Sequence, residues 1–226
     1  MRGRRLGRVL GFGGALALLA VVALAPRLLD LAAGPDAAIR TALQQSESVG
    51  LSLTIPHSPA SLVTRRLHFD RVTTHFDSQG EEAYALSTLD LEGTVDSITV
   101  SSLGVERVVF ERAGREWRPL HSLAPRLTAV IATLIARRES LESADPERLE
   151  RLAASPEIGR AARQDELFRR VASLPKPRYR VIAWYIRLDR DGALVTEEYQ
   201  TGTGTGTRRL TLQRRGPEFL FSGSLL

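Results

Sequence analysis

The stretch that decides the fold is residues 67–93, LHFDRVTTHFDSQGEEAYALSTLDLEG. Apolar and polar side chains alternate on both sides of a turn at residues 77–80, and this period of two around a glycine predicts a β-hairpin. The alternation continues through three further segments, residues 94–100, 105–112 and 116–120. A bend is expected at Leu103-Gly104. We therefore expect a meander of about four antiparallel strands.

A second meander closes the chain, and its first strand is RYRVIAWYIRL at residues 178–188. Four apolar side chains alternate along it and are expected to face a core: Ile182, Trp184, Ile186 and Leu188. Three more strands are expected at residues 193–200, 208–214 and 218–222. The run TGTGTGT at residues 201–207 lacks the lysine of a phosphate-binding loop, so it favours a hairpin connection or a weakly packed strand.

Prolines and acidic residues mark the expected helices. A short helix is expected within residues 35–49, and Pro125 begins a longer one whose apolar residues recur at helical spacing. Asp145 is expected to cap a third helix, which Pro156 interrupts. Residues 173–177 contain two prolines two positions apart, so the helical region ends there.

The two meanders resemble each other in order and in turn chemistry. Asp-x-x-Gly begins at Asp77 and again at Asp189, and Arg-x-Gly-x-Glu occurs at residues 112–116 and 214–218. Tight turns favour Asp and Gly for backbone reasons alone. Duplication and coincidence of turn chemistry therefore both remain open.

A helix followed by a four-stranded antiparallel meander resembles the cystatin-like and NTF2-like group of α+β folds. Three segments carry the resemblance: LDLEGT at residues 89–94, SSLGVERVVF at residues 101–110 and REW at residues 115–117. The resemblance covers residues 64–120 and, more loosely, 178–226. It implies a concave sheet wrapped on helices, and it implies no particular chemistry because the group contains enzymes, binding proteins and secretion-system subunits.

These patterns together predict an α+β protein in which helices pack on antiparallel β-meanders, with two tandem helix-plus-four-strand units as one arrangement. Residues 1–34 are expected to hold a basic stub, a membrane anchor and a linker. Residues 35–120 would form the first α+β unit, and residues 121–226 a helical pair plus the second meander. Whether the meanders form one sheet or two domains stays open.

The N-terminus carries a membrane-targeting pattern. Arg2, Arg4, Arg5 and Arg8 precede an uncharged run at residues 9–25. The run would span about 25 Å as a helix, near the short end of what a ~30 Å hydrocarbon core needs. The positive-inside rule then predicts a single-pass protein of a bacterial inner membrane, with its N-terminus cytoplasmic and its C-terminal body extracytoplasmic.

The alternative is a cleaved signal peptide, which shares the basic start and the apolar centre. Ala23-Leu24-Ala25 fits a cleavage site, but Pro26 would follow the cut, and this favours an uncleaved anchor. A secreted, soluble binder after cleavage remains the competing interpretation.

Composition excludes several classes of function. The formal net charge is +5, and four of these charges lie in the N-terminal stub, so the high isoelectric point does not indicate a nucleic-acid surface. The chain has no cysteine, which excludes disulfides, thiolate metal sites and a cysteine nucleophile.

One weak catalytic constellation is present. His68 and Asp70 would share a strand face, with Tyr84 on the neighbouring strand, so a general acid/base pair lining a cavity is conceivable. His75 is expected on the opposite face. Isolated histidines on amphipathic strands are more often solvated or structural.

No cofactor or metal site is expected. The calcium-loop pattern that includes Asp189 and Asp191 would place Arg187 at its first ligand position, which favours a plain hairpin turn. No grouping of residues supplies three convincing metal ligands.

These observations favour a non-catalytic role. We expect a membrane-anchored, extracytoplasmic interaction or binding protein, such as an accessory or assembly subunit of an envelope complex. Envelope proteins or a second copy of the chain are the expected partners, and nucleic acid is not. The alternatives are an NTF2-like cavity enzyme that uses His68, Asp70 and Tyr84, and a secreted ligand binder.

Overall fold

The computed structural model describes residues 34–47, 50–114, 116–202 and 204–226. The chain divides into two compact units at a boundary within helix α2 (Pro35–Ser46): one ends at Thr41, and the other runs from Ala42 to Leu226. No helix within the described ranges is long and apolar enough to cross a membrane. The predicted anchor at residues 9–25 lies outside these ranges.

The first half of the sheet is the predicted meander, preceded by one short strand. Its five strands are β1 (Ser52–Thr54), β2 (Ser61–Phe76), β3 (Glu82–Val95), β4 (Ile98–Ala113) and β5 (Glu116–Pro119). Each pairs antiparallel with the next. Odd-numbered residues of β3 are buried and even-numbered ones are more exposed, as the alternation predicted.

One predicted boundary in this half was wrong. The segment 94–100 is not a strand, because Asp96 and Ser97 both have positive φ and form a two-residue turn between β3 and β4. The expected bend at Gly104 instead lies inside β4. Gly-containing dipeptides are the usual signal for such a turn, and Asp-Ser lacks it.

The second half contains the other predicted meander. It consists of β6 (Arg180–Leu188), β7 (Gly192–Thr201), β8 (Gly204–Arg215) and β9 (Glu218–Phe221). Three of the four predicted core residues of β6 are buried, but Ile182 is 40% exposed. A register shift between Val181 and Ala183 changes which face the following residues occupy.

The two halves form one sheet, in the order β1-β2-β3-β4-β6-β7-β8-β9 with β5 on β4. The joining pair, β4 with β6, is parallel, whereas the strands within each meander pair antiparallel as predicted. Gly104 lies at this junction, where an added Cβ would come within 2.0 Å of the Leu188 carbonyl oxygen. The sheet therefore continues across the expected division at residues 120 and 121.

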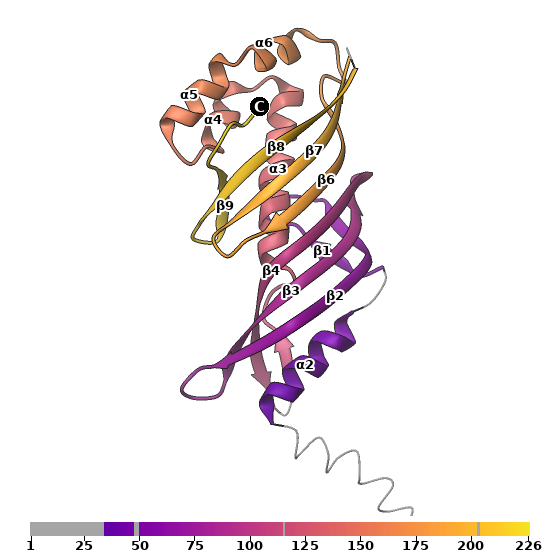
Figure 1. Cartoon of the computed structure of the whole chain (residues 1–226), viewed down its shortest axis with the longest axis vertical. Helices are drawn as coiled ribbons and strands as arrows, with labels where there is room; N and C mark the ends of the chain where they lie inside the picture. Colours follow the sequence, from indigo (N-terminus) through magenta and orange to yellow (C-terminus); the bar gives the residue numbers. More distant parts are fainter. Residues whose placement is uncertain (1–33, 48–49, 115, 203) are drawn as a thin grey trace, which may run out of the picture. The chain divides into compact units, whose positions relative to one another are not determined.

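Four helices connect β5 to β6, namely α3 (Pro125–Ser143), α4 (Pro146–Arg151), α5 (Pro156–Gln164) and α6 (Glu166–Ser173). Asp145, Ser155 and Asp165 cap the last three through their side chains. Helix α3 contacts β4, β6 and β9 and thus packs on both halves of the sheet (Figure 1).

Candidate functional site

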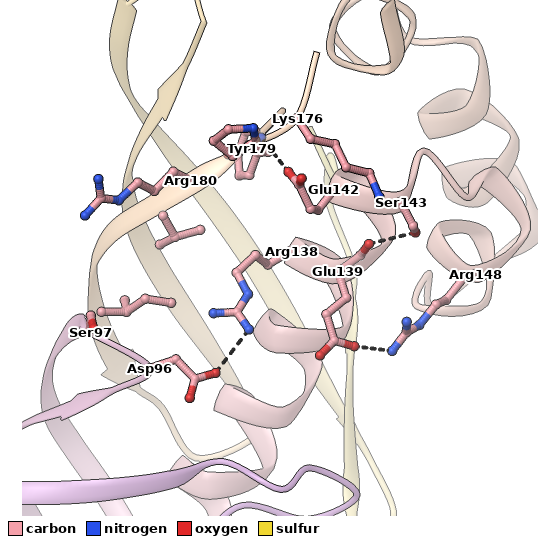
Figure 2. Close-up of a pocket in the computed structure, with 13 residues that line it drawn as sticks. Asp96, Ser97, Arg138, Glu139, Glu142, Ser143, Arg148, Lys176, Tyr179 and Arg180 are labelled. Carbon is pink, nitrogen blue, oxygen red and sulfur yellow. Dashed lines mark hydrogen bonds and ion pairs between the residues drawn. The ribbon is translucent and has the colours of Figure 1, made fainter. Parts of the chain in front are cut away.

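A polar cleft of about 560 Å³ lies where the β3–β4 turn, the C-terminal part of α3 and the segment entering β6 converge (Figure 2). Asp96 and Ser97 come from the turn, and Arg138 and Glu142 come from successive turns of α3. Lys176 to Val181 form the remaining wall. The cleft therefore combines segments that are 40 to 80 positions apart in the chain.

Each carboxylate of the cleft is already bound. Asp96 pairs with Arg138 at 3.2 Å, and Glu139 pairs with Arg148. Glu142 accepts the backbone N–H groups of Arg178 at 2.7 Å and of Tyr179 at 3.0 Å. These contacts attach the end of α3 to the turn, to α4 and to the β6 segment (Figure 2).

Two cations of the cleft differ from the rest. Lys176 and Arg180 line it, are exposed, and form no ion pair with any residue in the described ranges. Lys176 and Arg180 thus add positive charge without a counter-ion to the cleft, with their charged ends on different sides of it (Figure 2), and this favours an anionic ligand.

Tyr179, which lines the cleft, belongs to a buried polar network. The Tyr179 hydroxyl donates to Glu197 at 2.6 Å, and Trp184 Nε1 donates to the same carboxylate at 2.9 Å. Arg137 donates to both Glu197 oxygens, at 2.9 and 3.2 Å. Arg137 and Glu197 are fully buried.

The network decides the protonation of its members. Burial by itself would raise the pKa of Glu197, but Arg137, Tyr179 and Trp184 outweigh burial and hold this pKa below its usual value. Burial raises the pKa of Tyr179, so its hydroxyl remains a proton donor. Tyr179 is therefore a fixed wall of the cleft and not a proton carrier.

The network also holds more positive than negative charge. Arg208 lies 3.9 Å from Glu197 and stacks over the Tyr199 ring at 4.3 Å from its centroid. Within the described part of the chain, Arg137 Nη2 and Arg208 Nε and Nη1 are buried without a hydrogen-bond partner. Two guanidinium groups beside one carboxylate make the potential next to the cleft positive.

The hydroxyl and carboxylate groups of the cleft are held by neighbouring groups. The Ser143 hydroxyl donates to the Glu139 backbone oxygen at 2.7 Å, so it has no base as a partner. Across the described ranges, no three His, Asp or Glu side chains are grouped so as to hold a metal ion. The arrangement can retain an anion by hydrogen bonds and charge.

The structure places the sequence-predicted candidates elsewhere, on the more exposed face of β2 and β3. His68 Nδ1 lies 3.0 Å from the Glu47 carboxylate, which raises the pKa of His68 through this hydrogen bond. Asp70 accepts the neighbouring N–H of Arg71 at 2.8 Å. His68 and Asp70 thus share a face, as expected.

Tyr84 is not close to His68. His68 pairs with Asp90 across the strands, and Tyr84 is six residues further along β3, which corresponds to about 20 Å. Tyr84 instead stacks on His75 at 4.7 Å between ring centroids. The structure therefore does not assemble these three residues into one site.

The expectation for His75 was wrong, and a β-bulge explains why. Between Asp70 and Thr73 strand β2 advances three residues while β3 advances two, and Arg71 has a φ of 52°. The extra residue reverses the alternation, so His75 lies on the same face as His68.

Sequence reasoning missed the residues that form the cleft. Lys176 carried one signal, since it is the only lysine and lies between two prolines. Glu197 carried another, because it continues the buried alternation of Ala193 and Val195. Neither signal indicated which distant residues would lie beside them.

No protein-family model matches this chain, and no curated protein matches it. A solved structure described as "Ntf2 like protein involved in plasmid conjugation" matches 72% of this chain and 74% of that one, with 8% sequence identity and a TM-score of 0.27. A TM-score this low carries no argument about activity or partners.

Proposed function

We propose that this protein is a membrane-tethered, extracytoplasmic binding protein whose polar cleft holds an anionic group of its ligand. In this role it serves as an accessory component of an envelope system and not as an enzyme. The N-terminal arginines and the apolar run at residues 9–25 support the tether and its orientation.

The observation that carries the proposal is that the negative groups of the cleft already have partners, whereas two of its positive groups do not. Asp96, Glu139 and Glu142 each have cationic or N–H partners, whereas Lys176 and Arg180 have no counter-ion in the described part of the chain. An incoming carboxylate or phosphate would gain a charge-assisted contact with either cation without breaking an existing ion pair.

The first experiment is ligand-observed NMR of the full chain with glutarate as the probe. Wild-type protein should give a saturation-transfer signal that weakens as salt is added, because exposed charges are screened. The variant K176A/R180A should lose most of the signal.

A matched control removes the same charge elsewhere. Arg65 and Arg215 are exposed and lie outside the cleft, so R65A/R215A should bind glutarate as wild type does. Equal signals from wild type and K176A/R180A would overturn the proposal.

A further inference from the structure

A second hollow lies directly beside the polar cleft. It is a groove of about 490 Å³ along α3, with Ala129, Ala132 and Ala136 among its lining residues. Pro56, Leu152 and Pro217 belong to three other segments that line it. Thr133 contributes little polarity, because its hydroxyl already donates to the Phe219 backbone oxygen at 2.7 Å. The groove is therefore mainly apolar.

The groove and the cleft follow one another along the same helix. The groove is lined by α3 residues from Pro125 to Glu139, and the cleft by α3 residues from Arg138 to Ser143. Glu139 and Arg148 line both hollows, so this ion pair marks the place where they meet. One elongated ligand can thus contact both.

Charge is distributed unequally along this path. Arg148, paired with Glu139, lies where the groove meets the cleft, and Arg151 lines the groove and forms no ion pair with a residue in the described ranges. Lys176 and Arg180 continue the positive charge on the cleft side. A molecule lying along α3 would therefore place its apolar part against the alanines and its anion beyond Arg148.

The length of the groove fits an extended apolar chain. The α3 residues that line it, 125 to 139, extend over about 21 Å at 1.5 Å per residue. An unbranched chain can lie along this length with its charged end in the cleft.

We infer that the ligand is a single-chain anionic amphiphile, with its apolar chain in the groove along α3 and its carboxylate or phosphate head in the adjoining cleft. This inference rests on the proposed anion-binding function and adds the class of ligand. Each buried methylene contributes roughly fourfold in affinity, so chain length should dominate binding.

The test uses the full chain in membranes and dodecanoate with a photoreactive diazirine at its chain end. Labelled peptides identified by mass spectrometry should include residues 125–139 or 217–220. Unlabelled dodecanoate should compete at least about 100-fold better than butanoate, since much of the longer chain is buried.

Two variants locate the binding. A132W fills the groove and should reduce labelling by about tenfold, whereas A161W, at an exposed position of α5, should leave it unchanged. K176A/R180A should also reduce labelling by about tenfold. The comparison of dodecanoate with butanoate uses wild-type protein, so it tests the inference even if A132W does not fold.

The outcomes separate this inference from the proposed function. In one outcome, glutarate binding requires Lys176 and Arg180, but dodecanoate and butanoate compete equally well. This result would contradict the inference that the ligand is an amphiphile and would support the anion site. Absence of both kinds of binding would overturn both. If a helix of a partner protein is recovered crosslinked to the groove in cells, the inference that an amphiphile occupies the groove would also be contradicted.

Discussion

The two halves of the sheet each bury one glutamate on the core face, and the two are compensated in different ways. Glu106 on β4 accepts only backbone N–H groups, from Arg107 at 2.9 Å, Arg126 at 3.1 Å and Leu127 at 3.0 Å. Glu197 on β7 is held by a guanidinium, a phenol and an indole.

The type of partner decides the charge state. Burial raises the pKa of Glu106 to about 7, against the opposing effect of its N–H partners. The pKa of Glu197 stays below its usual value because a full positive charge lies in contact with it. Amide dipoles thus offset the cost of burying a carboxylate only in part, whereas an ion pair with further donors offsets it fully.

Glu106 nevertheless has a structural role that Glu197 lacks. The N-cap residue of α3, Ala124, offers no side-chain hydrogen bond, and Glu106 supplies the acceptor from a strand. It therefore fixes the start of the helix along which both hollows lie.

The largest expected effect comes from breaking the charge pair. E197Q leaves Arg137 buried without a counter-charge and should lower the free energy of unfolding by about 3–5 kcal/mol, measured by urea denaturation of the full chain. The control is E198Q, at a more exposed neighbouring position, with an expected change below about 0.5 kcal/mol. Similar losses for the two variants would show that Arg137 does not depend on Glu197.

The pH dependence of stability tests Glu106 directly. Between pH 4.5 and about 7 the unfolded chain releases the Glu106 proton while the folded chain keeps it, so stability should fall as the pH rises, by about 3 kcal/mol at most. E106Q should remove this part of the pH profile. Glu197 acts in the opposite sense, since its stabilisation is lost as the pH falls below about 4.5. A flat wild-type profile from pH 5 to 8 would contradict the raised pKa of Glu106.

A smaller change probes a single bond within the Glu197 network. Y179F removes the donor at 2.6 Å from Glu197 and should lower the free energy of unfolding by about 1.5–3 kcal/mol, the range for hydrogen bonds to charged groups. Y185F alters an exposed tyrosine of β6 and should have little effect. A loss below that of Y185F would remove Tyr179 from the network.

The smallest effect is expected at an exposed pair. His68 and Glu47 should contribute below about 1 kcal/mol, because exposed ion pairs are screened by solvent. Since Glu47 raises the pKa of His68, this contribution should be present at low pH and lost as the pH rises through the folded-state value. An NMR titration should show the pKa of His68 falling in E47Q. An unchanged pKa would exclude the contact in solution.

Local chemistry explains why much of the fold could be predicted. The alternation in β3 and the prolines at the helix starts are patterns of a few neighbouring residues, so they can be recognised in the sequence. The turn at Asp96-Ser97 and the bulge at Arg71 have no such signal, and each changed a prediction about neighbouring residues.

By itself, the sequence determined the α+β class, both meanders, the starts of α2, α3 and α4 and the absence of thiol chemistry, because each depends on nearest neighbours or on composition. Only the tertiary structure decided that β4 and β6 join the meanders in parallel, that Tyr84 lies far from His68, and that Arg138, Lys176 and Asp96 share a cleft. These features arise from contacts between distant segments, and such contacts are selected by the packing of the whole core and leave no local pattern.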